Sequence, residues 1–262
     1  MLKSDPFKTI LKKILFYLIL VILWEAIYRV CVEYLHLWKA YSFSSPGSVL
    51  MTLIRLINED NTLGIAILIS LKRVFTGYFI SLFTGILLGL IVVRFKYLKD
   101  NVSPIFLGLQ TLPNVCWIPF AILWYGLNES AIIFVVTIGS TFSIAIAVKS
   151  GIDNINPIYI KVAKTMGARG LVLYKNVTLP AALPNIISGM KQGWSFAWRA
   201  LIAGEMLSAS IGLGQLLMIG REVFDMSQVT AIMLVIITIG VVVDRFVFGR
   251  LEARIRYRWG LQ

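Results

Sequence analysis

The sequence has few acidic residues, few cysteines and almost no histidine. Its 262 residues include 13 Asp and Glu, 2 Cys and 1 His. Cys31 and Cys116 lie in apolar runs, and no Cys, His or carboxylate cluster surrounds His36, so we expect neither a disulfide framework nor a metal site. The sequence also lacks a phosphate-binding G-x-x-x-x-G-K-[ST] loop and a Ser-His-Asp or Cys-His set. We therefore expect no ATP hydrolysis and no covalent catalysis by this chain.

Apolar residues dominate what is present. They make up 58% of the sequence, and the mean hydropathy is +0.82. Only 15% of the residues are charged, against about 25% in ordinary soluble domains. A soluble protein could not bury several separate apolar runs of about 20 residues each. The composition therefore predicts an all-α integral membrane protein.

Six stretches are candidates for membrane-spanning helices, since a span needs about 20 mostly apolar residues. They are residues 14–32, 74–93, 102–127, 130–148, 183–207 and 226–243. The first contains Glu25 and Arg29, which are one helical turn apart and can neutralise each other. The fifth is the weakest candidate, because it contains Lys191, Arg199 and Glu205. We retain it because, without it, each end of the last span would be assigned to the wrong side of the membrane. Residues 1–262 then form a single transmembrane domain.

Basic residues fall mostly on one side of these predicted spans. With a cytoplasmic N-terminus, the inside segments hold Lys3, Lys8, Lys12, Lys13, Arg94, Lys96, Lys99, Lys149, Lys161, Lys164, Arg169, Lys175, Arg245, Arg250, Arg254, Arg256 and Arg258. The outside segments hold Lys39, Arg55, Lys72, Arg73 and Arg221. This asymmetry follows the positive-inside rule, so we expect both termini in the cytoplasm. The net charge of +12 then reflects topology, and we expect no nucleic-acid binding.

Small residues recur at every fourth position in two predicted spans. The second span has Gly77, Ser81, Gly85 and Gly89, and the fifth has Gly189, Gly193 and Ala197. Such faces allow close approach of helix backbones. They are typical of ordinary helix packing, and a face that slides between moving helices is the alternative. Outside these spans, the helical periodicity after Pro46 predicts an amphipathic helix at the membrane surface.

Proline interrupts the third predicted span. Its sequence QTLPNVCWIPFAILWYG places Gln110, Asn114 and Trp117 around Pro113 and Pro119. Each proline frees a backbone carbonyl, and broken helices at membrane depth are usually buried in protein or line a cavity. Two interpretations remain open: a structural kink, or a segment that lines a translocation path.

A polar segment, residues 155–182, separates the fourth and fifth predicted spans on the cytoplasmic side. It contains KVAKTMGARGLVLYKNVTLPAA. Residues 157–173 are predicted to form a short helix, which Pro180 and Pro184 end before the next span. A short helix held by a proline-stiffened elbow suits the docking of a soluble partner, so we name residues 155–182 the coupling segment.

Four motifs in the chain, VAKTMGA, VTLPAALPNIISGMKQG, AGEM and IGLG, resemble those of permease subunits of bacterial ABC importers. The nitrate/sulfonate/taurine type is the most similar subgroup, and the resemblance covers most of the chain from about Ser70. It implies a type I importer permease fold of about six helices in the bacterial inner membrane. It also implies that the coupling segment contacts the ATPase through Lys161, Ala163, Lys164, Gly167 and Ala168. Lys161 departs from the family pattern, which usually has an acidic residue there.

The resemblance further implies the partners and the cargo. The partners are two ATPase subunits that bind ATP and Mg²⁺, an external substrate-binding protein and a second permease copy, as a homodimer within membrane lipid. The cargo is a small, often anionic solute such as a sulfonate, taurine or nitrate, or in some members a vitamin-precursor pyrimidine. No cofactor is expected in this chain. The mechanism would be alternating access driven by ATP.

The candidate path or gate residues are Gln110, Asn114, Trp117 and Glu205. For Glu205 two interpretations remain open: a solvated carboxylate at the outer end of its span, or a gate or binding-protein contact. The alternative function is an ion-coupled secondary transporter, in which Glu25, Glu205, Lys191 and Arg199 would be the ionisable residues at membrane depth. The coupling segment would have no role in such a carrier. An intramembrane enzyme is disfavoured, because the sequence offers no nucleophile or metal constellation.

Overall fold

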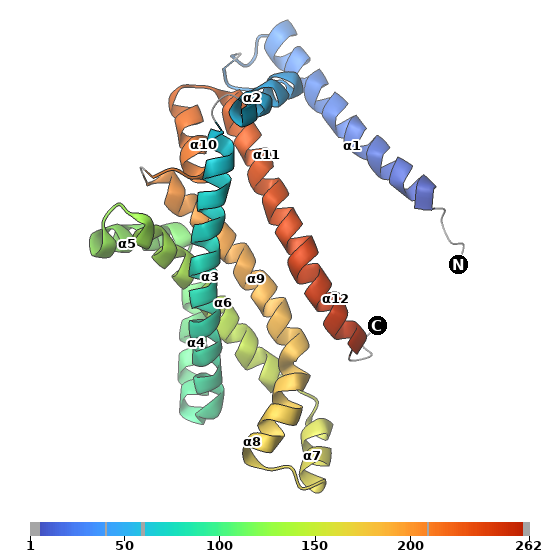
Figure 1. The fold of residues 1–262 in the computed structure, drawn as a ribbon, viewed down its shortest axis with the longest axis vertical. Coiled ribbons are helices and arrows are strands. Elements are labelled where there is room, and N and C mark those ends of the chain that lie inside the picture. Colours follow the sequence, from blue (N-terminus) through green and yellow to red (C-terminus); the bar gives the residue numbers. More distant parts are fainter. Residues whose placement is uncertain (1–5, 40, 59–60, 209, 259–262) are drawn as a thin grey trace. The chain divides into compact units, whose positions relative to one another are not determined.

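Helices joined by short turns make up the computed structural model, which describes residues 6–39, 41–58, 61–208 and 210–258. These ranges contain no strand (Figure 1). Lys3, counted above for the charge asymmetry, and the two chain ends lie outside the described residues. The chain divides into two units, one formed by Met1–Ala66 and Leu216–Ile236, the other by Ile67–Gln215 and Ile237–Gln262.

The first unit contains α1 (Pro6–Tyr28), its π-helical continuation η1 (Arg29–Tyr34) and α2 (Pro46–Asn58). Glu25 Oε1 lies 2.7 Å from Arg29 Nε, which confirms the neutralising pair predicted from sequence. Helix α2 begins at Pro46, as the periodicity predicted. Hydrogen bonds hold the segment before it in place: Trp24 Nε1 donates to the Ser44 carbonyl at 3.0 Å, and Ser44 Oγ donates to Thr230 at 3.0 Å.

In the second unit, α6 (Glu129–Asp153) packs against both α3 (Thr62–Arg94) and α9 (Leu179–Met206). The small-residue faces make these contacts. A methyl group added at Gly85 would lie 2.8 Å from the Ile144 side chain, and one at Gly193 would meet the same side chain at 2.8 Å. Ser140 Oγ donates to Ser81 Oγ at 2.7 Å. Both predicted small-residue faces therefore contact α6.

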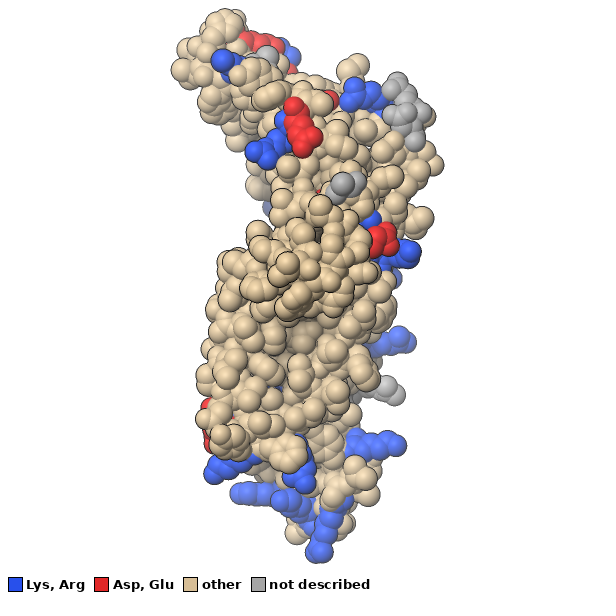
Figure 2. Space-filling model, turned by 90° about the vertical axis from the view of Figure 1, so that its left-hand side faces the viewer, with Lys and Arg blue, Asp and Glu red and all other residues tan. Residues whose placement is uncertain are grey.

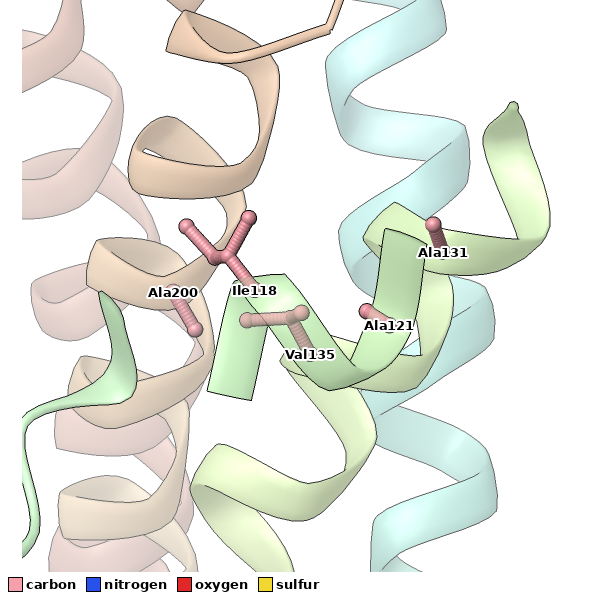
Figure 3. Packing of buried hydrophobic residues seen from close by; sticks show 5 residues of the cluster. All are labelled: Ile118, Ala121, Ala131, Val135 and Ala200. Carbon is pink, nitrogen blue, oxygen red and sulfur yellow. The ribbon is translucent and has the colours of Figure 1, made fainter. Parts of the chain in front are cut away.

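The third predicted span is not one helix. Helix α4 (Lys96–Thr111) and the segment Asn114–Tyr125 meet at a bend of 99°. That segment comprises a 3₁₀ turn, η2 (Asn114–Trp117), and α5 (Ile118–Tyr125), and Pro113 lies at the break. Figure 3 shows how apolar side chains fix the second arm; they are Ile118 and Ala121 of α5, Ala131 and Val135 of α6, and Ala200 of α9. Cys116, which lies in an apolar run of the sequence, is exposed in the turn.

Among the described residues, four helical stretches are long and apolar enough to cross a membrane, and the count is five if the bent pair is one span. The four are Ile10–Tyr34, Thr62–Arg94, Glu129–Asp153 and Met226–Ile255. Helix α9, the fifth predicted span, is continuous over 28 residues, but its charged residues lower its hydropathy. The last stretch continues through η4 (Asp244–Phe248) and α12 (Gly249–Arg258), so Arg245 lies inside a helix and not in a tail that follows residue 243.

Charge is unevenly spread over the second unit. Lys and Arg gather at the end that carries α7 (Pro157–Thr165) and α8 (Gly170–Leu173), below a broad band that is almost free of charge (Figure 2). A charge-free band beside a basic end is the surface expected of a protein whose helices cross a membrane.

Candidate functional site

The coupling segment contains a short helix that ends earlier than the sequence predicted. Helix α7 ends at Thr165, and Gly167 follows with φ of +88°, a conformation in which glycine is strongly favoured. The Gly167 N–H donates to the Lys164 carbonyl at 3.0 Å, and the Ala168 N–H donates to the Ala163 carbonyl at 2.9 Å. These two bonds form a Schellman cap. Gly167 therefore terminates the helix, and the prediction of one helix over 157–173 is wrong.

Pro180 and Pro184 do not end a helix either. Helix α8 continues through a π-helical turn, η3 (Tyr174–Thr178), directly into α9. Pro180 lies just after this π-helical turn and Pro184 lies further along, so the helix runs through both prolines. The elbow of the segment is therefore at Gly167, not at the prolines.

The predicted coupling residues differ in exposure. Lys161, Lys164 and Gly167 are exposed, Ala168 is half-buried, and Ala163 is buried within the chain. A free apolar face lies beside them and is formed by Ile158, Tyr159, Val162 and Met166. The Ala163 methyl group therefore packs inside the chain, while larger side chains are available to a partner. The assignment of the five residues to ATPase coupling stays a prediction.

Glu205 is fully buried, so its interpretation as a solvated carboxylate is wrong. Ser70 Oγ lies 2.8 Å from both carboxylate oxygens. Arg73 Nη1 donates to Oε1 at 3.0 Å, and the Gly214 N–H donates to Oε2 at 3.1 Å. Arg199, two turns earlier on the same helix, instead donates to the Ser195 carbonyl. Three donors, the Ser70 hydroxyl, the Gly214 N–H and the Arg73 guanidinium that also forms an ion pair, thus replace the water that this carboxylate would otherwise need.

Arg73 is the centre of the same network. Its side chain is buried, although the sequence predicted it in an outside loop. Besides Glu205, it donates to the Ile211 carbonyl at 2.8 Å and to Glu129 Oε1 at 3.1 Å. The Glu129 side chain is 52% exposed, so the network runs from the interior to the surface. Sequence reasoning missed Arg73 and Ser70 as partners of Glu205, because 132 and 135 residues separate them from it.

The IGLG motif surrounds the carboxylate. A methyl group added at Gly212 would lie 2.5 Å from the Glu205 carboxylate, and one at Gly214 would lie 2.7 Å from the Ile202 carbonyl oxygen. The Leu213 N–H donates to Ser70 Oγ at 3.0 Å, at the start of α10 (Leu213–Glu222). The carboxylate therefore caps the N-terminus of this helix, where negative charge is stabilising. Only residues without a side chain fit against Glu205 at these two positions.

The remaining predicted path residues lie at the bend between α4 and α5. Asn114 Nδ2 donates to the Phe196 carbonyl at 3.2 Å, and its Oδ1 would be 2.9 Å from a methyl group added at Gly139. Trp117 packs partly buried against the cluster of Figure 3, and Gln110 is half-buried near the end of α4. Asn114 thus ties the broken span to α9. A path-lining role for Gln110, Asn114 and Trp117 stays a prediction.

Comparison with known proteins identifies the chain. A family model described as binding-protein-dependent transport system inner membrane component matches residues 81–257. The nitrate import permease protein NrtB of Synechocystis sp. is 31% identical over 191 residues, which cover 72% of this chain and 68% of that protein. The protein of Escherichia coli K12 named as aliphatic sulfonates transport permease SsuC is 36% identical over 151 residues, which cover 58% of this chain and 57% of that one.

A solved structure shares the fold. A chain of the inward-facing MetNI methionine ABC transporter matches with a TM-score of 0.65, covering 75% of this chain and 97% of that chain at 21% identity. The match confirms the all-α architecture of type I importer permeases. The family match also confirms the resemblance seen in the four motifs, and it supports a permease rather than a secondary transporter or an enzyme. The chain belongs to the binding-protein-dependent transport system inner membrane components, the multi-pass permease subunits of ABC importers.

Proposed function

We propose that two identical copies of this chain form the path for a small anion of the nitrate or sulfonate class. The names of the similar permeases, for nitrate and for aliphatic sulfonates, support this cargo. We further propose that both termini are cytoplasmic, that ATP and Mg²⁺ bind to the partner ATPase, and that an external binding protein delivers the solute. The basic end of the second unit supports this orientation, because positive charge is retained on the cytoplasmic side (Figure 2).

The observation that carries the coupling part of the proposal is the free face of α7. Val162 and Met166 are one turn apart, with 52% and 83% of their surface exposed, and Lys161 and Lys164 lie beside them. An apolar helix face rimmed by basic residues suits insertion into a groove of a soluble partner. We propose that this face, and not the small residues Ala163 and Gly167, makes the contact with the ATPase.

The test is to purify the permease with its ATPase from membranes. We expect Val162→Asp to insert normally but to lose the ATPase subunits, because it places a charge on the contact without straining the backbone. The matched control is Tyr97→Asp, which changes a residue of α4 that is 77% exposed. Full retention of the ATPase by Val162→Asp would remove α7 from the contact.

The cargo and the energy source are tested together in proteoliposomes. The ATPase subunits face the interior of the vesicles, where ATP is enclosed. We expect this ATP to drive uptake of nitrate or an alkanesulfonate only when the binding protein is present. Uptake that follows an ion gradient without ATP would contradict the proposal. The homodimer is tested in cells that express one permease gene, with one cysteine introduced into the permease. A crosslink between two copies in their membranes would establish the homodimer.

A further inference from the structure

A cavity of about 570 Å³, open along one side where Arg199 and Arg245 are exposed, lies between α9 and the helical stretch that joins the end of α11 (Met226–Val243) to α12. Its charged lining residues are Lys191 and Arg199 of α9, and Asp244 and Arg245 of η4. Trp194 and Trp198, which are 2% and 8% exposed, form its aromatic floor, with ring planes 16° apart and centroids separated by 6.3 Å, and Trp198 presents the larger free surface. All of these residues belong to the second unit. No sequence motif indicates that they lie together.

The cavity lies beside the middle of α9. Lys191 is close to the middle of the 28-residue helix α9, and Arg199 is two turns further on, about 12 Å along the axis. Lys191 Nζ lies 3.2 Å from Asp244 Oδ2, so η4 is level with the middle of α9. The opposite face of α9, with Gly189 and Gly193, packs against α6. The charged residues are therefore not at a helix end, from which a long side chain could reach water.

Positive charge in this cavity is only partly neutralised. Asp244 pairs with Lys191, whereas no carboxylate of the described residues lies within ion-pair distance of Arg199 or Arg245. Arg199 instead contacts its own helix, through the Ser195 carbonyl at 3.0 Å and the Phe196 ring, whose centroid is 4.8 Å away. Arg199 lies within the predicted span 183–207, and unpaired cations inside a membrane are costly and mark ion or substrate pathways by default.

The size and the aromatic floor of the cavity indicate what it holds. Its volume lies in the range of about 300–1,000 Å³ that is typical of sites for organic ligands. A bare oxyanion would leave most of this space empty and would not use the indole rings. An anionic head group on an apolar body matches both features, since the guanidinium groups can bind the head group and the rings can contact the body.

We propose that this cavity is a binding site for a small organic anion, with its sulfonate or carboxylate group on Lys191, Arg199 and Arg245 and its apolar part on Trp194 and Trp198. This inference deepens the proposed function, on which it rests, by naming the site and the head-and-tail character of the cargo. The Lys191–Asp244 pair keeps one cation in place, and the two free guanidinium groups make the attraction for the anion.

The test uses the permease–ATPase complex in nanodiscs of zwitterionic lipid, with 3-bromopropanesulfonate as the probe. Bromine quenches indole fluorescence on contact, so we expect saturable quenching that Trp198→Phe largely removes. Arg199→Gln and Arg245→Gln should each raise the apparent Kd at least tenfold, because each loses a charge-assisted hydrogen bond. The matched control is Arg250→Gln on α12, whose guanidinium lies over Phe246 and does not line the cavity. Its Kd should stay within twofold of the unchanged protein.

Several results would overturn the site. They are unchanged binding in both Arg199→Gln and Arg245→Gln, unchanged quenching in Trp198→Phe, and equal quenching by neutral 3-bromopropanol. If nitrate displaces the probe at equal concentration, the ligand of this site is an inorganic anion and not an organic one. Loss of quenching in nanodiscs with phosphatidylglycerol would assign the cavity to a lipid head group.

A separate readout distinguishes this inference from the proposed function. The probe could bind with the expected dependence on these residues while proteoliposomes take up no anion. That result would support the binding site and contradict the proposed cargo. If uptake of an alkanesulfonate is normal in Arg199→Gln and Arg245→Gln, the proposed function stands and the cavity is not on the path.

Discussion

Arg73 and Glu205 form an ion pair whose side chains are 3% and 0% exposed, with 3.0 Å between Nη1 and Oε1. The pair joins α3 to α9 near the start of α10. Because removal of one partner leaves the other charge buried, such a pair is a strong constraint even where its net contribution to stability is small. We expect it to hold this end of the second unit in one arrangement.

The two carboxylates that Arg73 contacts allow a matched comparison. We expect Glu205→Ala to lower the free energy of unfolding by about 3–5 kcal/mol, because it leaves Arg73 buried without its inner partner. Glu129→Ala should cost at most about 1 kcal/mol, since the Glu129 carboxylate is half-exposed. Unfolding by SDS in mixed micelles measures both values. Equal losses in the two variants would contradict the assignment of Glu205 as the buried anchor.

Gly214 provides a steric test of the same region. A methyl group at this position would lie 2.7 Å from both the Glu205 Cβ and the Ile202 carbonyl oxygen, so we expect Gly214→Ala to destabilise the protein by about 1–3 kcal/mol. Gly108→Ala, in α4, is the control, because nothing lies within 4 Å of the added methyl group. We expect that change to be neutral or slightly stabilising. Equal free energies of unfolding for Gly214→Ala and Gly108→Ala would contradict the close packing around Glu205.

Gly167 separates a helix-capping role from a docking role. Gly167→Ala should reduce ATP-driven uptake, because alanine resists the φ of +88°. Asparagine adopts this conformation more readily, so Gly167→Asn should recover a large part of the uptake. Transport and ATPase co-purification are measured for both variants. Equal failure of Asn and Ala would show that position 167 must be small for the partner, as the motif implies.

Lys161 tests whether the departure from the family pattern selects a partner. If the ATPase presents an acidic residue to the exposed Lys161, Lys161→Glu should weaken binding of that ATPase, and reversal of the facing charge should restore it. A double-mutant cycle measures the coupling energy, for which we expect more than about 1 kcal/mol. Lys96→Glu, at an exposed position of α4 outside the coupling segment, is the control. A coupling energy of zero would make Lys161 an ordinary solvated lysine.

Features that depend on neighbours in sequence were predictable. The Glu25–Arg29 pair, the start of α2 at Pro46 and the small-residue faces all follow from helical spacing, and each lies where periodicity placed it. The four motifs likewise indicate the correct family from the order of their residues alone. In each of these cases the residues concerned are a few positions apart, so no knowledge of the tertiary fold is needed.

Features that depend on tertiary contacts were not predictable. The burial of Glu205 is decided by Ser70 and Arg73, which lie on another helix.

The mistaken end of the coupling helix has a local cause: proline favours the first turn of a helix as well as the residues after one, so Pro180 could mark either a start or an end. The positive φ of Gly167, which resolves this ambiguity, is invisible in sequence.

The continuity of α8, η3 and α9 has a mechanical consequence. From Gly170 to Met206 the chain is one unbroken helical lever, about 55 Å long. Its lower end adjoins the Gly167 elbow, the buried Glu205 anchors its upper end, and Lys191 and Arg199 lie along its shaft. A lever fixed at one end turns force at the other into displacement that grows with distance from the fulcrum. Lys191 would therefore be displaced further than Arg199 when α7 is pushed. Because both are fixed on the same helix, their own separation stays constant, and the stroke changes their distances to Arg245 on η4.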